Sequence, residues 1–166
     1  MTKKPLIACA AFLAFSSQAF ALDAIFASAD WDGVTVPEGQ QCQKFGGSDP
    51  ATPAWTVSDI PVGSDAILLE YSDRDSERMN NGGHGRMQFA IEPGSDSVSI
   101  PPVPGHSFEL PAGFTLVEEH RGAGWDLEGA YMPPCSGGKG HAYYVTIKAL
   151  KGDQVTAETV VEMGSY

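Results

Sequence analysis

Hydrophobic and polar positions follow short, strand-like spacings along most of the chain. Residues 66–71 form a mostly apolar run, which is typical of a strand buried on both faces. Residues 86–91 alternate between polar and apolar side chains, as a half-buried strand does. Residues 142–150 are rich in aromatic and β-branched side chains and form the strongest strand candidate. Residues 57–60 and 114–118 are weaker candidates.

Helical signals are confined to the C-terminal segment. The sequence predicts a short helix from Thr156 to Met163, with Gly164 at the position after the last turn where glycine commonly ends a helix. Residues 94–113 are rich in proline and glycine and are expected to be loop-like. Because no change of composition marks a second unit, we expect one mostly β domain over residues 22–166.

The first 21 residues have the layout of a cleavable secretory signal peptide. Lys3 and Lys4 precede an apolar run over residues 6–15, and small residues stand at Ala19 and Ala21. The apolar run is shorter than the roughly 20 residues that a transmembrane helix needs. We therefore expect a periplasmic or secreted protein without a transmembrane segment. The alternative is a lipoprotein signal in which Cys9 is acylated.

Charge and cysteine content limit the classes of partner and indicate the redox environment. The chain has a net charge of −11, which argues against nucleic acids and anionic membranes as partners. Two cysteines, Cys42 and Cys135, remain after removal of the signal. In an oxidising compartment such a pair favours a disulfide, the alternative being two buried thiols that never meet.

Polar side chains that could take part in binding or catalysis lie next to three of the expected strands. Asp73 and Asp75 come after the strand at 66–71, His84 precedes the strand at 86, and His141 with Tyr143 opens the strand at 142. Loops at one end of a sheet often carry function, so these residues are candidates for a small polar pocket. The alternative is a solvated turn at Asp73 and Asp75 and an ordinary surface histidine at position 84.

The sequence lacks the familiar motifs for catalysis, metal binding and nucleotide binding. No Gly-x-Ser-x-Gly motif is present to expose a nucleophilic serine. Residues 28–39 lack the first and last ligands of a calcium loop, and the glycine-rich loop 137–140 leads into a strand rather than a phosphate-binding helix. The histidines show no zinc-site spacing; they are His84, His106, His120 and His141. We therefore expect no catalytic residue, no metal and no cofactor.

Several motifs occur in an order that is similar to a known family. Over residues 26–92 and 129–166 the chain resembles the phosphatidylethanolamine-binding protein family, in particular its bacterial Raf-kinase-inhibitor-like branch. The motifs that carry the resemblance are Asp32-Gly33 with Pro37, Cys42 and Gly46; Thr52-Pro53-Ala54-Trp55 with Ile60-Pro61-Val62-Gly63; Leu68 to Asp75; Pro134-Cys135 with Gly138 and His141-Ala142-Tyr143; and Gly164-Ser165-Tyr166.

The resemblance implies a β-sandwich-like domain with a small anion pocket at one end. In the family that pocket receives a phosphate or a phosphorylated head group, and the matching positions here are Asp73, Asp75, His141 and Tyr143. A second family histidine falls on His84 by residue type, or on Arg86 by its spacing from Pro93. The pocket motif has also lost several prolines, and Arg74 or Arg86 could supply compensating charge.

These observations lead to three hypotheses. The first is an exported, non-enzymatic binding protein with a small polar pocket for an anion or a phosphorylated head group. The second is a protein-interaction module that inhibits or modulates an unknown secreted partner and keeps only a vestigial pocket. The third is a small hydrolase that uses Asp73 or Asp75 with His141 as acid and base.

Overall fold

The computed structural model describes residues 21–166. The predicted signal peptide, apart from Ala21, and the alternative lipid site at Cys9 lie outside the described residues. No helix in the described part of the chain is long and apolar enough to cross a membrane. Nearly all regular structure is strand, and one short 3₁₀ helix, η1, spans Gln43–Phe45.

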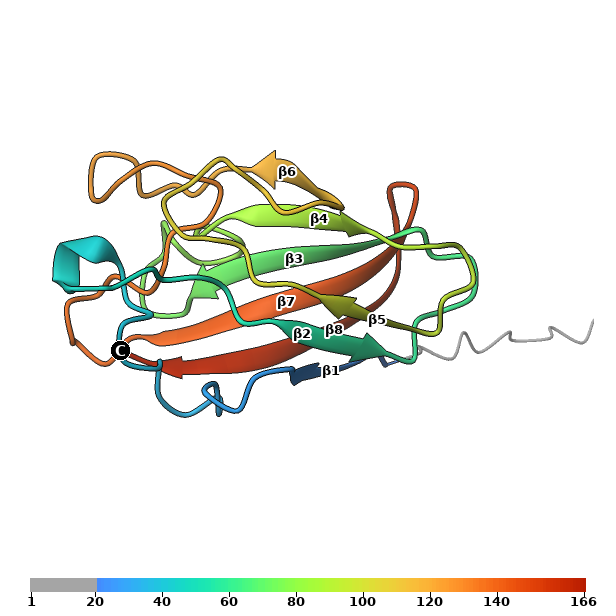
Figure 1. Ribbon diagram of the computed structural model, residues 1–166, viewed down its shortest axis with the longest axis horizontal. Helices are drawn as coiled ribbons and strands as arrows, with labels where there is room; N and C mark the ends of the chain where they lie inside the picture. Colours follow the sequence, from blue (N-terminus) through green and yellow to red (C-terminus); the bar gives the residue numbers. More distant parts are fainter. Residues whose placement is uncertain (1–20) are drawn as a thin grey trace, which may run out of the picture.

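Five antiparallel strands form the larger sheet, in the order β6-β4-β3-β7-β8 (Figure 1). The strands are β3 (Ala66–Asp73), β4 (Arg86–Ala90), β6 (Phe114–Glu118), β7 (Ala142–Lys151) and β8 (Gln154–Ser165). The predicted strands at 66–71, 86–91, 114–118 and 142–150 coincide with β3, β4, β6 and β7, each within two residues at either end.

The central strand, β3, is buried along its whole length. Its neighbours β4 and β7 pair with both edges, and residues 66–69 are apolar because a hydrophobic cluster covers each face there. Because side chains alternate between faces, Ile67, Leu69 and Tyr71 enter the main core. Asp73 follows them in the same alternation and is opposite Tyr143 of β7. The main-core face of β3 therefore ends in a carboxylate.

A second, three-stranded antiparallel sheet has the order β1-β2-β5. Its strands are β1 (Asp23–Phe26), β2 (Trp55–Ser58) and β5 (Ser97–Ile100). The predicted strand at 57–60 is therefore β2 displaced by two residues, whereas β5 occupies part of the segment 94–113 that we expected to be loop. Trp55, Val57 and Ile100 belong to the same hydrophobic core as β3 and β7.

The prediction of a C-terminal helix over 156–163 is wrong, because these residues lie in β8. Ala157 and Met163 are buried, Thr159 and Val161 are partly buried, and the residues between them are exposed, so the segment has the period of a strand. Gly152 and Asp153 make the tight turn that folds β8 back onto β7. Gly164 is not a helix terminator: its φ is +105°, and a side chain at this position would collide with the backbone of Thr35.

Candidate functional site

One cavity of about 260 Å³ lies at the end of the larger sheet where β3 finishes and β7 begins. Four of the six residues expected at the pocket line it: Asp73, His84, His141 and Tyr143. Asp73 and Tyr143 arrive on paired strands, and the two histidines arrive on the loops that precede β4 and β7. The loops gathered at this end of the sheet are at the left of Figure 1.

Asp73 and His141 form the closest polar pair in the cavity. Oδ2 of Asp73 is 2.7 Å from Nδ1 of His141, and Oδ1 of Asp73 accepts the backbone N–H of Asp75 at 2.8 Å. The side chain of Asp73 is only 5% exposed. Both carboxylate oxygens are therefore engaged, and the imidazole of His141 is oriented with Nε2 as its free nitrogen.

His84 is the most isolated polar group of the cavity. Its Nδ1 is 2.6 Å from the backbone oxygen of Met132, so Nδ1 carries the hydrogen and donates it. Nε2 is buried and has no hydrogen-bond partner among the described residues. Burial lowers the pKa of His84 to about 4, and this outweighs the opposite effects of the Met132 carbonyl and of Asp73. His84 is therefore neutral at pH 7 and holds an unused acceptor.

Tyr143 closes the cavity beside these two histidines. Its ring meets that of His84 edge to face at a centroid distance of 5.3 Å. Its hydroxyl oxygen accepts the backbone N–H of Cys135 at 3.1 Å. Burial raises the pKa of Tyr143 to about 12. The phenol is therefore protonated at neutral pH and can itself donate a hydrogen bond.

Two cations at the cavity, Arg78 and Lys139, were not among the expected site residues. Both side chains line the cavity, and neither forms an ion pair with another residue of the described chain. Lys139 lies two residues before His141, which the sequence marked as a candidate, so its neighbourhood was a usable signal. No sequence pattern singled out Arg78, because it belongs to the long turn between β3 and β4.

Part of the cavity wall is apolar. Met79, Trp125 and Met132 contribute side chains to the lining. Trp125 is about half exposed, and the ammonium of Lys44 lies 3.4 Å from the centroid of its ring. Trp125 comes from the stretch of chain that shows no family motif, so sequence reasoning did not find it. The cavity thus combines polar groups with an aromatic edge.

Asp75 does not line the cavity, although we expected it there. Its Oδ2 accepts the backbone N–H of Ala142 at 2.8 Å, at the first residue of β7. The contact joins the end of β3 to the start of β7. Asp75 therefore acts on the position of His141 rather than on an occupant of the cavity.

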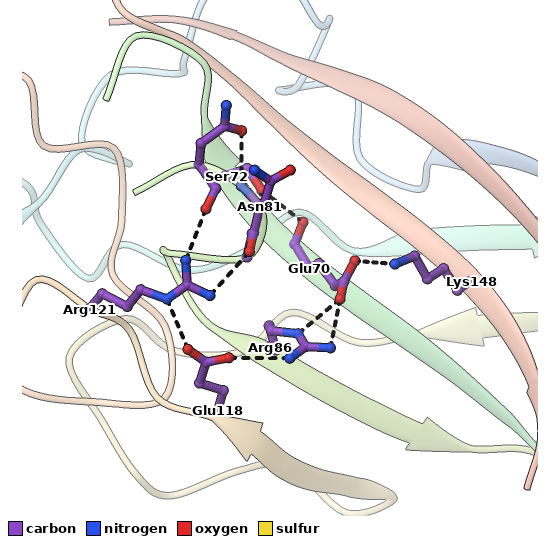
Figure 2. A network of polar contacts seen from close by, with 9 residues as sticks. Glu70, Ser72, Asn81, Arg86, Glu118, Arg121 and Lys148 are labelled. Atoms are coloured by element: carbon purple, nitrogen blue, oxygen red, sulfur yellow. Dashed lines mark hydrogen bonds and ion pairs between the residues drawn. The ribbon is translucent and has the colours of Figure 1, made fainter. Parts of the chain in front are cut away.

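Arg86 also lies away from the cavity. Figure 2 shows its guanidinium between Glu70 and Glu118, at 2.8 and 3.2 Å from their carboxylate oxygens. Lys148 reaches the other oxygen of Glu70 on the same face of the sheet. Of the two residues considered for the second family histidine, only His84 reaches the cavity. Arg74 pairs instead with Glu162 and is not a cavity residue either.

The predicted disulfide between Cys42 and Cys135 is present. Cys135 lines the cavity, and Cys42 directly precedes η1. The bond therefore ties the N-terminal loop to the segment that approaches β7. A cross-link that closes so long a loop removes conformational freedom mainly from the unfolded chain.

Comparison with known proteins identifies the fold. Models of protein families and curated protein sequences give no match to this chain. Among solved structures, a phosphatidylethanolamine-binding protein homologue from Chlamydia trachomatis superposes with a TM-score of 0.52 and 19% sequence identity. The match covers 89% of this chain and 98% of the other. The chain therefore has the fold of phosphatidylethanolamine-binding proteins, a mostly β fold that is built here from two antiparallel sheets.

Proposed function

We propose that the protein is an exported, non-enzymatic binding protein whose cavity takes a small anion bearing a phosphate group. One observation carries the proposal: Arg78 and Lys139, both without an ion-pair partner among the described residues, line the same cavity in a strongly acidic chain. Unpaired cations around a concave site favour an anionic occupant. The phosphate head group suggested by the name of the structural neighbour fits the same chemistry.

The negative charge of Asp73 does not oppose this proposal. Its two carboxylate oxygens are taken up by His141 and by the amide of Asp75. The contact with Asp73 fixes the ring of His141, so Nε2 is the nitrogen that an occupant of the cavity would contact. Asp73 is thus a positioning residue for His141.

The free Nε2 of His84 narrows the class of anion. An unprotonated ring nitrogen repels an oxygen that carries no hydrogen, but it accepts a hydrogen bond from an oxygen that does. Inorganic phosphate retains such a hydrogen at neutral pH, a phosphomonoester retains it mainly below its second pKa of about 6, and sulfate has none. We therefore propose that the occupant is a hydrogen-bearing anion.

The size of the cavity limits the rest of the ligand. A volume of about 260 Å³ falls below the roughly 300–1,000 Å³ of sites for drug-sized molecules. The apolar edge at Met79 and Trp125 leaves room for a short organic substituent on the phosphate. A compact phosphomonoester such as phosphoethanolamine suits these dimensions.

Binding rather than hydrolysis is favoured by what surrounds His141. Its one side-chain hydrogen bond within residues 21–166 is to Asp73, and no hydroxyl is held against it as a nucleophile. Ser136, which also lines the cavity, donates its hydroxyl to the carbonyl of Tyr166. The dyad of Asp73 and His141 therefore lacks the third group that covalent catalysis needs, and hydrolysis at this site would have to use water directly.

Export and family membership are parts of the same proposal. The predicted signal peptide and the disulfide both support an oxidising destination outside the cytoplasm. The ordered motifs and the shared fold support a divergent member of the bacterial branch, with its two sheets packed as the family's sandwich. A mature N-terminus at Leu22 on protein recovered from the producing cell would support export, and an uncleaved chain would contradict it.

Thermal unfolding with added ligands tests the binding proposal. Inorganic phosphate and phosphoethanolamine at 100 times Kd should stabilise the fold by about 2.7 kcal/mol, which raises Tm by several degrees. His141→Gln should weaken this response, whereas His106→Gln, outside the cavity, should retain it. No shift with either ligand would contradict the proposal. If the wild type hydrolyses p-nitrophenyl phosphate and His141→Gln does not, the protein is instead a hydrolase.

A further inference from the structure

A second cluster of chemically versatile side chains lies beside the disulfide. Sγ of Cys42, Sγ of Cys135 and a carboxylate oxygen of Asp126 all lie within 4.8 Å of one another. Oδ2 of Asp126 is 3.7 Å from Sγ of Cys135 and 3.4 Å from Nε2 of His106. These four residues come from three separate loops, so the spacing of histidines along the sequence gave no sign of the cluster.

Asp126 is unusual within this cluster. Its side chain is only 7% exposed, yet no lysine or arginine of the described chain pairs with it. Its contacts are the imidazole of His106 and a disulfide sulfur, which has no hydrogen to donate. Burying a carboxylate with so little compensation is costly. A cation that binds at this point would compensate it.

His106 presents the form of imidazole that a metal requires. Its Nδ1 lies 3.3 Å from the carbonyl of Leu127, and its Nε2 accepts the N–H of Gln43 at 3.3 Å. Nδ1 therefore carries the hydrogen, and Nε2 has the lone pair. Metal-binding histidines commonly donate their second N–H to a carbonyl in this way. The side chain of His106 is 2% exposed, which limits its movement.

Two of the distances between candidate ligand atoms match those in a tetrahedral zinc site. Zn–S bonds of about 2.3 Å and Zn–N or Zn–O bonds of about 2.0–2.1 Å place neighbouring ligand atoms roughly 3.3–3.8 Å apart. The separations of 3.4 Å from Asp126 to His106 and 3.7 Å from Asp126 to Cys135 fall in this range. Two features depart from this geometry. The bonded sulfurs are only about 2 Å apart, and no nitrogen of His106 lies within 4.8 Å of Asp126 and both sulfurs together, so reduction must let the loops move closer.

We propose that reduction of the Cys42–Cys135 disulfide opens a zinc site with Cys42, Cys135, Asp126 and His106 as its ligands. A dithiol reductant supplies two electrons and two protons, the S–S bond breaks, and the reductant becomes a disulfide. Zn²⁺ then displaces the two thiol protons and the weak N–H contact from Gln43. Two thiolates, a carboxylate and an imidazole form a closed structural site. The disulfide and the metal are alternative cross-links of the same loops.

Spectroscopic titration of the purified protein with Co²⁺ and Zn²⁺ tests this proposal. The oxidised protein should bind neither ion at the site. After reduction with a phosphine, one equivalent of Co²⁺ should give the visible bands of tetrahedral cobalt together with thiolate charge-transfer bands, and Zn²⁺ should abolish both. Asp126→Asn and His106→Gln should each lower zinc affinity by more than 10-fold, whereas Asp153→Asn, in the exposed β7–β8 turn, should not.

Circular dichroism decides the case in which reduction unfolds the chain. Zn²⁺ should then restore the strand spectrum of the wild type but not that of Asp126→Asn. Three results would overturn the proposal: no metal bound by the reduced protein, an octahedral cobalt spectrum, or equal affinity in Asp126→Asn and the wild type. The last result would mean that two free thiols bind zinc without the cluster.

Discussion

Nδ1 of His84 and the backbone oxygen of Met132 are 2.6 Å apart, and this one contact determines which nitrogen of His84 is left without a hydrogen-bond partner. With Nδ1 as the donor, the buried Nε2 is an acceptor that has no partner within the described chain. The proposed preference for a hydrogen-bearing anion follows from this geometry. It also links the site to the pH dependence of stability.

Stability should fall with acidification because of His84. Its pKa is about 4 in the folded protein and about 6.5 when exposed. Between these values the unfolded chain binds a proton that the folded protein does not, so stability is lost as the pH falls from 6.5 to 4. The loss should reach about 3 kcal/mol, and His84→Gln should remove it. Urea unfolding at pH 7, 5.5 and 4.5 measures the difference; parallel pH profiles for both proteins would contradict it.

Phosphate should bind at least about 10-fold more tightly than sulfate at neutral pH. The reason is that sulfate brings an oxygen without hydrogen to the free acceptor of His84, and a buried unsatisfied polar group costs about 1–3 kcal/mol. Isothermal titration calorimetry with each anion measures the ratio. In His84→Gln, whose amide can rotate to donate, the preference should shrink. Equal affinities of the wild type for phosphate and sulfate would mean that His84 does not select the anion, although an anion would still bind.

Two variants, Lys139→Met and Arg86→Met, should show that phosphate affinity and thermal stability depend on different cations. Lys139 lines the cavity without an ion pair, so its loss should weaken phosphate binding several-fold and leave Tm nearly unchanged. Arg86 lies between two carboxylates on the other face of the sheet, so its loss should lower Tm and leave phosphate affinity unchanged. Calorimetry and thermal unfolding of both variants provide the comparison. The reverse pattern would place the anion site elsewhere.

Loss of the disulfide should destabilise the fold strongly. Cys42 and Cys135 close a loop with a sequence separation of 93, for which loop-closure entropy predicts about 4–5 kcal/mol. Urea unfolding of the double variant with serine at both positions, in the presence of a chelator, measures this loss. A change below about 1 kcal/mol would mean that the unfolded chain is already constrained at these loops.

Strand-forming segments of the larger sheet were predictable because their patterns are strong. The first four residues of β3 are all apolar and are buried on both faces, and β7 is rich in aromatic and β-branched residues. The same alternation already excludes Arg86 from the cavity: Met87 enters the core, so its neighbour Arg86 must lie on the opposite face. The alternation of residues 86–91 in the sequence therefore already separates Arg86 from the core-facing positions.

Other features of the fold and the site depend on tertiary contacts that no local sequence pattern indicates. In β8, helix-compatible residues form a strand because β7 pairs with them over their full length. Arg78 and Trp125 reach the cavity from long connections whose paths depend on the whole fold. The cluster of Cys42, His106, Asp126 and Cys135 joins three loops, so no spacing rule could find it.

NMR of the four histidine side chains during a phosphate titration tests the central claim most directly. The nitrogen signals of His84 and His141, which line the cavity, should shift and reach saturation together. The signals of His106 and His120, which do not line the cavity, should stay in place and serve as internal controls. Saturable shifts confined to His84 and His141 are the result that we predict. Unchanged signals from these two rings, or equal shifts in all four, would contradict an anion site in this cavity.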